Sequence, residues 1–507
     1  MESTTAQASA TQQPQLKSNA ITFVSNVVIG VASTAPGFSL ATTVGFIVAI
    51  GGVGLQAPAV MLVSFVPMFC IAIAYQWLNK ADPDCGTTFS WVTRAMGPQI
   101  GWLSGWGLLV ACLVVMATQS SIAGSYSLQL FDIAPEGSVL GIDATTFWIT
   151  VVGVFWILVM TVICYIGIEL SARTQQGLLA AEIVTLLAFA VVALIKVYGS
   201  SAPEGSLHIA ASWFNPFAVE SPAAMLDGLL LGVFLYWGWD SAVSVNEETV
   251  DGSNAPGKAA VLSTILLLLI YIVVTAAAQA YAGEQALVDN AVDIFAGGLG
   301  NNVLGDGFDK LLIIAVLTSS AAATQTTILP AARAALSMGR KKAIPSFFSE
   351  IHHKHQTPGH ATWVFGVASV LLFIGLNLSS ENVLADSLTA CGFLVCFYYA
   401  FTGFACILFY RKRIFRSTGN FMRLGLLPLI GAVSLSVVFI KAFIEYSNPE
   451  NTNEAIFGLG VPLVIGIGAL IVGLIGMLYA NIAHREFFRE NRPETVSEEL
   501  AAAEGIA

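Results

Sequence analysis

The groups of this chain that could do chemistry gather at two interruptions of long apolar segments. Residues 33–37 (Ser-Thr-Ala-Pro-Gly) interrupt the stretch 21–50, and residues 237–241 (Trp-Gly-Trp-Asp-Ser) interrupt the stretch 222–245. Unwound backbone at membrane depth is stable only where it is buried in protein or lines a cavity. Paired interruptions in two halves of a chain are also the best sequence indication of a solute site near the membrane midplane. We therefore expect a ligand site where the two breaks meet.

The first break offers donors for an anionic group. Pro36 lacks a backbone N–H and clashes with the preceding turn, so a second half-helix begins there, directly after Ala35. The N–H groups and the positive dipole end of that half-helix favour a carboxylate. Ser33 and Thr34 could add hydroxyl donors, and Gly37 would let a ligand approach the backbone. The alternative is a simple proline kink, which membrane helices tolerate.

The second break offers acceptors for a cationic group. Freed carbonyls near Tyr236 and Gly238 would attract an ammonium group, as carbonyls at a helix C-terminus do. The aromatic faces of Tyr236, Trp237 and Trp239 could add cation–π contacts, although ordinary packing is the preferred explanation for the two tryptophans.

Two carboxyl side chains lie at depths where a charge is costly. Asp240 stands near the middle of its segment, where it could pair with an amine, carry a proton or support the unwound backbone. Glu182 lies nine residues beyond Arg173, which is about 13 Å along a helix and too deep for an interfacial carboxylate. A buried carboxyl takes up a proton more readily than an exposed one, so Glu182 could carry a proton, or bind a cation when ionised. A hydrogen-bonded structural carboxylate is the alternative.

Composition places the chain in a membrane. It has 507 residues, of which 56% are hydrophobic and 10% charged, against about 25% charged in soluble proteins. A bilayer crossing takes about 20 apolar residues, and twelve stretches are long enough: approximately 21–50, 57–79, 98–130, 145–167, 174–197, 222–245, 258–282, 309–336, 361–378, 384–409, 424–444 and 457–482. The sequence thus predicts an all-α integral membrane protein with about twelve transmembrane helices, of which the first and sixth are broken.

The basic residues predict an orientation. With the N-terminus inside, 18 of the 21 Lys and Arg side chains fall in cytoplasmic segments, which leaves Lys196, Lys310 and Lys441 outside. We expect both tails, 1–20 and 483–507, to be cytoplasmic, and the lipid partner to be a bacterial-type plasma (inner) membrane. The net charge of −11 does not indicate a nucleic acid partner.

The span count predicts an internal repeat. Five spans in 21–197 precede the second broken helix, and five more in 222–409 begin with it. An odd number of spans makes the second set enter from the opposite side, so we predict inverted repeats. Two peripheral helices follow in 424–482. The acidic tail from Glu486 onward is typical of a disordered segment.

Four groups of residues, 81–91, 97–106, 234–248 and 333–358, form ordered motifs. They contain, in order, Asp-Pro-Asp-Cys-Gly-Thr-Thr-Phe, Gly-Pro-Gln-Ile-Gly-Trp with Gly-Trp, Tyr-Trp-Gly-Trp-Asp-Ser-Ala with Glu-Glu, and Arg-Ala-Ala-Leu-Ser-Met-Gly-Arg with Ile-Pro and Thr-Pro. In this order and at these spans, the motifs resemble the amino acid–polyamine–organocation (APC) transporter superfamily, which has the leucine-transporter-type five-plus-five fold. Cys85 stands where that family usually has glycine.

The resemblance implies roles for the second break. The backbone around Tyr236 and Gly238 would hold the substrate amine, and Phe234 aligns with an aromatic position that closes over the ligand. Acids are frequent at the position of Asp240 in this family, which favours gating or backbone support over recognition of one substrate.

Two further segments resemble coupling sites of the superfamily. Aligning residues 165–167 (Tyr-Ile-Gly) with the family puts Glu182 where some proton-coupled members carry a lysine, and the carboxyl departs from that pattern. Residues 317–320, which include Thr318 and Ser319, resemble the segment that supplies sodium ligands in sodium-coupled relatives. Their hydroxyls could equally bond back to their own helix.

These observations predict secondary active transport of a small amine-bearing solute, an amino acid first of all, by proton symport through Glu182. Sodium symport through Glu182, Thr318 and Ser319, an exchanger or polyamine carrier, and a ligand-binding membrane protein without net transport are the alternatives. We expect neither an enzyme nor a cofactor, apart from a coupling H⁺ or Na⁺. We expect no metal site either, because the histidines of one short loop lack a nearby cysteine: His352, His353, His355 and His360. The sequence does not name the substrate or the oligomeric state.

Overall fold

The computed structural model describes residues 15–199, 202–295, 298–305, 307–378, 383–449, 455–498 and 502. Within these residues, twelve helical segments are long and apolar enough to cross a membrane. In chain order they are α1 (Phe23–Ser33) with α2 (Pro36–Ala49), α3 (Ala57–Ala81), α5 (Pro98–Leu130), α6 (Ala144–Ile166), α7 (Ile168–Tyr198), α8 (Pro222–Tyr236) with α9 (Ser241–Ser244), α10 (Ala255–Asp289), α12 (Asp309–Arg340), α13 (Gly359–Asn377), α14 (Val383–Tyr410), α16 (Leu427–Tyr446) and α17 (Val461–Ala483). The prediction of an all-α protein with twelve spans is confirmed.

Short elements connect these spans. Four are short α-helices: α4 (Thr88–Met96), α11 (Leu299–Leu304), α15 (Thr418–Asn420) and α18 (Arg485–Glu490). Two β-hairpins pair β1 (Ser138–Val139) with β2 (Ile142–Asp143) and β3 (Ala455–Ile456) with β4 (Leu459–Gly460). The remaining turns of helix are η1 (Gly54–Gln56), η2 (Ala211–Phe214), η3 (Pro216–Ala218), η4 (Asn246–Glu248), η5 (Ser346–Ser349), η6 (Ile414–Arg416) and η7 (Phe421–Leu426).

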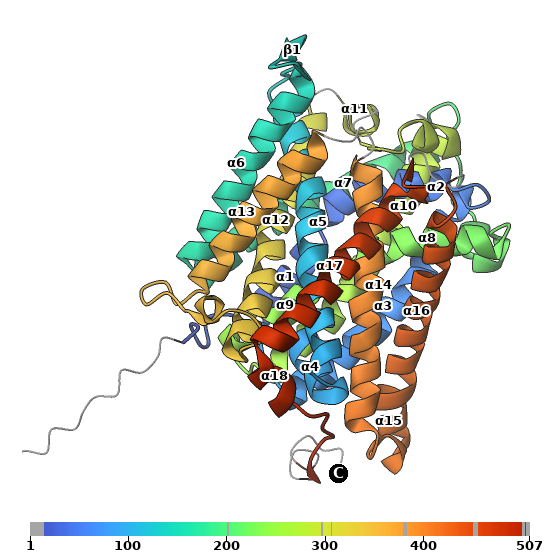
Figure 1. Cartoon of the computed structure of the whole chain (residues 1–507). Helices are drawn as coiled ribbons and strands as arrows, with labels where there is room; N and C mark the ends of the chain where they lie inside the picture. Colours follow the sequence, from blue (N-terminus) through green and yellow to red (C-terminus); the bar gives the residue numbers. More distant parts are fainter. Residues whose placement is uncertain are drawn as a thin grey trace, which may run out of the picture.

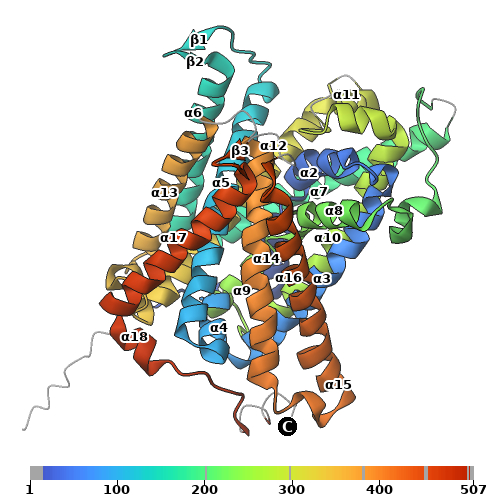
Figure 2. The ribbon, with the colours of Figure 1, turned by 45° about the vertical axis from the view of Figure 1, so that its right-hand side comes forward.

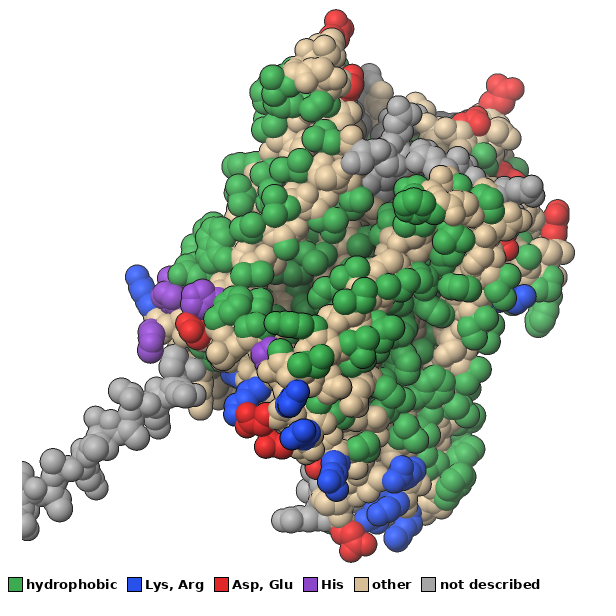
Figure 3. Space-filling model, in the orientation of Figure 1, with side chains coloured by type: hydrophobic (Ala, Val, Ile, Leu, Met, Phe, Trp, Pro, Cys, Tyr) green, Lys and Arg blue, Asp and Glu red, His purple; other side chains and the backbone are tan. Residues whose placement is uncertain are grey.

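Burial separates central helices from lipid-facing ones. In its most apolar window, the first broken helix is 89% buried, whereas α6, α7 and α17 are each 33% buried. The open faces of α7 and α17 carry apolar side chains such as Val184, Ile195 and Ile475, as surfaces in contact with lipid do. Figure 3 shows the apolar surface on the face that α17 crosses, with Lys and Arg gathered mainly at its lower end. The first broken helix therefore lies at the centre of an integral membrane protein.

The spans form two groups of packed helices. In the first group, α10 packs against α1, α3 and α9, and α3 packs against α8. In the second group, α5, α6, α12 and α13 all pack against one another. The two last spans are peripheral, as predicted: α16 packs against α14 and α3, and α17 crosses the outside of α14 and α5 (Figures 1 and 2). The inverted repeat inferred from the span count stays a prediction.

Both predicted breaks are present. Helix α1 ends at Ser33 and α2 begins at Pro36, with Ala35 between them in the left-handed conformation (φ 48°, ψ 67°). Helix α8 ends at Tyr236, Gly238 has φ 122°, and α9 begins at Ser241. In Figure 1, α2 and α8 lie in the upper half of the molecule and α1 and α9 in the lower half.

The prediction of a disordered tail from Glu486 onward is wrong for the residues that the structure describes. Residues 485–490 form helix α18, and Phe487 and Phe488 are buried. An even number of spans places the beginning of α1 and the end of α17 on one side, the lower side of Figure 1, which we call the terminal side. The described part of the tail therefore folds against the terminal side.

Substitution of Gly238 by alanine tests the close contact of the two breaks. A Cβ at this position would lie 2.5 Å from the carbonyl oxygen of Ser33 and 3.0 Å from the nitrogen of Thr34. Left-handed backbone alone costs a non-glycine residue on the order of 1–3 kcal/mol. We expect Gly238→Ala to lower the thermal unfolding midpoint in detergent.

The matched control is Gly177→Ala in α7, because a Cβ there would meet nothing within 4 Å. An unfolding midpoint for Gly238→Ala equal to that of the control would contradict the close approach.

Candidate functional site

The start of half-helix α2 is held by side chains from two other spans. The N–H of Gly37 donates to Glu182 Oε1 at 2.6 Å, and the N–H of Phe38 donates to Ser319 Oγ at 3.1 Å. Ser319 Oγ in turn donates to Glu182 Oε1 at 2.8 Å. The left-handed turn at Ala35 directs these N–H groups towards α7 and α12. A carboxylate at a helix N-terminus is favoured by the helix dipole as well as by the hydrogen bonds.

The carboxylate at the first break is therefore the chain's own. We expected the N–H groups of α2 to face a ligand carboxylate, but in this conformation Gly37 and Phe38 already have acceptors. A Cβ on Gly37 would lie 3.3 Å from Ser319 Cβ and 3.4 Å from Glu182 Oε1. Because Gly37 has no side chain, those of Glu182 and Ser319 can reach the backbone of α2. Glu182 itself is fully buried, and its Oε2 has no hydrogen-bond partner among the described residues.

The hydroxyls predicted for the site separate into two kinds. Ser33 Oγ lies 2.7 Å from Ser241 Oγ, so it joins the first break to the second. Thr34 Oγ1 donates to the carbonyl of Val31 at 2.6 Å, and Thr318 Oγ1 donates to the carbonyl of Ala315 at 3.0 Å. These two threonines bond back to their own helices, which is the alternative that hydroxyl chemistry allows. The structure brings Glu182 and Ser319 together, but Thr318 uses its hydroxyl elsewhere.

The second break contains a chain of hydrogen bonds that ends on Asp240. The indole N–H of Trp237 donates to the hydroxyl of Tyr398. That hydroxyl donates to Asp240 Oδ2 at 3.2 Å. Asp240 is buried, and no Lys or Arg forms a salt bridge with Asp240 or Glu182 within the described part of the chain. The arrangement can hold the unwound backbone in place and leaves Asp240 without a cationic partner.

Aromatic rings surround this break. Tyr236 packs against Phe65 and Tyr271, with ring centroids 6.0 Å and 5.2 Å away. Trp239 packs against Tyr75 and Tyr399 at 5.1 Å and 5.3 Å. The Tyr236 hydroxyl and the Trp239 indole N–H are buried with no hydrogen-bond partner among the described residues. The two rings therefore pack as ordinary core aromatics and still offer donors to a bound group.

Phe234 is also buried, two residues before the end of α8. Its position agrees with the predicted place beside the break, and its role over a ligand stays a prediction.

Sequence reasoning missed two partners of the breaks. Tyr398 lies on α14, 158 residues beyond Asp240, and nothing in its local sequence distinguishes it from other tyrosines of that span. Ser241 belongs to the second interruption, but its contact with Ser33 depends on how the two breaks cross.

Ion pairs connect the two helix groups on the terminal side. Arg333 of α12 donates from Nε and Nη2 to the two carboxylate oxygens of Glu248, at 2.6 Å and 2.9 Å, and both side chains are buried. Two further pairs lie beside it: Arg340 with Glu247 at 2.8 Å and Lys341 with Asp84 at 3.0 Å. We call these three pairs the terminal gate. Each joins the first group, near α3 or α9, to the end of α12.

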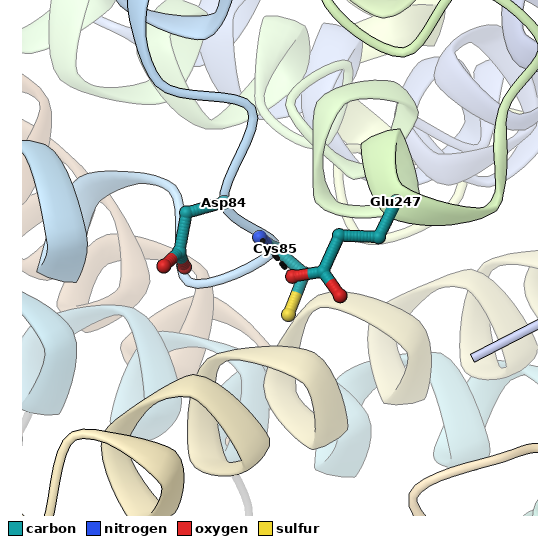
Figure 4. A group of neighbouring side chains, drawn as sticks. All are labelled: Asp84, Cys85 and Glu247. Atoms are coloured by element: carbon teal, nitrogen blue, oxygen red, sulfur yellow. Dashed lines mark hydrogen bonds between the residues drawn. The ribbon is translucent and has the colours of Figure 1, made fainter. Parts of the chain in front are cut away.

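Asp84, Cys85 and Glu247 form a group whose possible ligand atoms lie within 4.8 Å of one another. Figure 4 shows the Glu247 carboxylate against the backbone N–H of Cys85, which donates to it at 3.1 Å. The carboxylates are already paired with Arg340 and Lys341, and burial raises the pKa of the Cys85 thiol well above its usual value. A metal ion here would face two cationic side chains. The group fits the terminal gate better than it fits a metal.

The ionised state of Asp84 is insensitive to physiological pH. Burial opposes its ionisation, but Lys341 and hydrogen bonds from Ser337, Ser90 and Gly86 together lower the pKa of this carboxyl to about 2. A lowered pKa means that the stabilisation is present at neutral pH and is lost only as the pH falls through about 2. This gate pair therefore contributes no pH dependence between pH 5 and 8.

The four histidines lie in the linker between α12 and α13. His352, His353 and His360 line a surface cavity of about 560 Å³ together with Tyr165 and Trp363. His360 Nδ1 lies 3.2 Å from Glu350, and no three of these imidazoles form a preformed ligand group within the described ranges.

Comparison with known proteins agrees with this architecture. The sequence model of the amino acid permease family matches residues 19–470. A branched-chain amino acid permease of Bacillus subtilis is 24% identical over 65% of this chain and 70% of its own length. A low-affinity putrescine importer of Escherichia coli is 23% identical over 92% of this chain and 94% of its own. An arginine/ornithine antiporter of Latilactobacillus sakei is 23% identical over 68% and 70%.

The matched region contains both broken helices, the terminal gate and eleven complete spans. The chain therefore belongs to the amino acid permease family of the APC superfamily, whose members are membrane transporters and not enzymes.

Proposed function

We propose that this protein is a secondary active transporter that carries an amino acid by alternating access, together with a proton. The observation that carries the proposal is the contact of Glu182 with the N-terminus of half-helix α2. The substrate would bind between the two breaks, where helix ends supply backbone groups of both signs. The two helix groups would rock against each other around this site.

The relatives support an amine-bearing substrate. Their names cover branched-chain amino acids, putrescine, and arginine with ornithine. These solutes differ in size and charge, and the chemistry that they share is an aliphatic amine. In this chain, an ammonium group would be attracted to carbonyls at the end of α8 and to the surrounding aromatic faces.

Glu182 is suited to carry the coupled proton. Oε1 accepts two hydrogen bonds, from Gly37 and Ser319, and Oε2 accepts none from the described residues. A proton on Oε2 would neutralise a fully buried charge and leave both bonds to Oε1 in place. Loss of the proton would restore a carboxylate at the positive end of α2 and strengthen the attachment of α2 to α7. Protonation would thus change how firmly the first broken helix is held.

Sodium symport is the alternative for coupling. A hard cation needs several oxygen ligands, and Glu182 with Ser319 offers two that already lie together. Thr318 would have to break its bond to Ala315 to take part.

The terminal gate supports the proposal of alternating access. Its three ion pairs join the helix group of the broken helices to α12 and close the terminal side. This side is cytoplasmic in our proposal, because it holds most of the Lys and Arg residues. The membrane would be a bacterial plasma membrane, with solute entering from the opposite side.

A diamine is the second candidate substrate. The putrescine importer matches almost the whole chain, and two buried carboxyls, Asp240 and Glu182, stand without salt-bridge partners among the described residues. Two ammonium groups could use both. The two candidates are separated by measuring how unlabelled putrescine and unlabelled leucine, added in turn, inhibit the uptake of the labelled amino acid mixture. Inhibition by putrescine and not by leucine favours the diamine.

Replacement of Glu182 by glutamine should abolish the pH dependence of uptake. Glutamine keeps an acceptor oxygen for Gly37 and Ser319 but cannot ionise, so the uptake rate should no longer fall as the external pH rises from about 5.5 to about 8. Labelled amino acid uptake into liposomes measures it.

The control is Glu169→Gln at the start of the same helix, where the side chain is half-exposed and pairs with Lys17. A pH profile of Glu182→Gln that matches both the control and the unmodified protein would remove Glu182 from the coupling mechanism.

Replacement of Asp240 by asparagine should lower turnover more than affinity. If Asp240 supports the break through Tyr398, the kcat of uptake falls while KM changes by less than about twofold. Tyr398→Phe should show the same pattern, and the double variant should be no worse than either single one, because the residues act as a unit. A large rise in KM at constant kcat would instead assign Asp240 to direct amine binding.

A further inference from the structure

The segment that follows α17 forms a strap across the terminal side. We call residues 485–498, which comprise α18 and the extended segment after it, the C-terminal strap. In Figures 1 and 2, α18 lies below α17 and close to α4. The proposed transport chemistry does not use this segment, and its composition gave no indication that it would dock.

Two aromatic residues anchor the strap. Phe487 and Phe488 are 2% and 8% exposed, although they follow a transmembrane helix on the aqueous side of the molecule. The Phe487 ring stacks on Phe89 of α4 at 5.7 Å. Trp102 of α5 and Met338 of α12 belong to the same buried cluster. Burial of each ring removes a large apolar area from water, so the contact is a folded interface and not a loose tail.

Polar contacts attach the strap on both sides of the two phenylalanines. Glu486 pairs with Lys342 at 2.6 Å, directly after α12. Glu494 pairs with Arg94 of α4 at 3.1 Å, and its backbone N–H donates to the Arg94 carbonyl at 2.7 Å. The N–H of Val496 donates to the carbonyl of Phe409, near the end of α14, at 3.0 Å. The strap therefore connects the ends of α12 and α14 through α4.

These contacts lie on both sides of one ion pair of the terminal gate. Lys342 binds the strap, and its neighbour Lys341 binds Asp84 of the gate. Arg94 binds the strap and also lies 3.5 Å from Asp82, two residues before Asp84. One cavity of about 340 Å³ is lined by gate and strap residues together. The strap thus fixes both backbone segments that present the Asp84–Lys341 pair.

We propose that the C-terminal strap is an intramolecular brake that holds the terminal gate closed and must loosen before the cytoplasmic side opens. The partner of the surface formed by α4, the end of α12 and the end of α14 is then the chain's own tail. The proposal rests on alternating access as proposed above. It does not depend on the identity of the substrate or of the coupling ion.

Cys85 is a natural reporter of the gate. It is fully buried beside Glu247, and the other six cysteines lie within the spans. In a variant that keeps Cys85 alone, a maleimide added from the cytoplasmic side of membrane vesicles should label it only when the gate opens. The reporter needs no substrate, so its result is independent of the uptake assays.

Release of the strap should speed the labelling of Cys85. We expect Phe487→Ala with Phe488→Ala to raise the initial labelling rate about tenfold, the change that a loss of about 1.4 kcal/mol of closing free energy produces. The matched control is Phe415→Ala, because Phe415 is 83% exposed on the same side and its ring packs against Phe421, which belongs to neither the strap nor the gate. In this control, Cys85 should be labelled at the same rate as in the protein with the unmodified strap.

A charge exchange separates release of the strap from misfolding. Lys342→Glu alone should speed labelling of Cys85, and addition of Glu486→Lys should restore slow labelling, because the pair is re-formed with opposite signs. A second background that keeps only Cys112, which is buried in α5, should stay unlabelled in every variant that is folded.

Equal labelling of Cys85 in all variants, with Cys112 protected, would overturn the proposal while leaving the proposed transport intact. Faster labelling in the charge-reversed variant without rescue by the exchange would also overturn it.

Discussion

The structure depends on one constraint, which is that backbone donors freed by a break inside a membrane must find acceptors within the protein. The break at Ala35 frees the N–H groups of Gly37 and Phe38, and the acceptors are Glu182 of α7 and Ser319 of α12. One carboxylate therefore attaches the first broken helix to two neighbouring spans. The same carboxyl is buried, and one of its oxygens has no hydrogen-bond partner in the described part of the chain. Its charge and the position of α2 therefore cannot be independent.

The second constraint is that the two breaks touch. Gly238 lacks a side chain, and a Cβ at this position would meet the backbone of Ser33 and Thr34. Across the same contact, the hydroxyl of Ser33 lies within hydrogen-bond distance of Ser241 Oγ. A displacement of α1 and α2 must therefore change the position of α8 and α9 as well. Asp240 extends this coupling to α14 through Tyr398. The proposed substrate site, the proposed proton site and the terminal gate thus belong to one connected set of helices.

Much of the fold could be predicted from the sequence, because apolar length and charge are strong signals in membranes. The spans, both breaks and the depth of Glu182 follow from hydropathy, Pro36 and spacing. The partner of α2 could not be predicted, since a free N–H does not reveal whether a ligand or a distant glutamate will accept from it. Tyr398 was missed because its role depends on long-range packing. The C-terminal strap was missed because acidic residues mask Phe487 and Phe488 in a compositional reading.

The central claim is that a proton gradient drives an amine-bearing solute through the site between the breaks. It is tested most directly by uptake of a labelled amino acid mixture into liposomes that contain the purified protein, with the membrane potential clamped. An inward proton gradient should drive accumulation above the external concentration, and an inward sodium gradient without a proton gradient should not. Accumulation with sodium alone, or label uptake only by exchange with preloaded amino acid, would contradict the account.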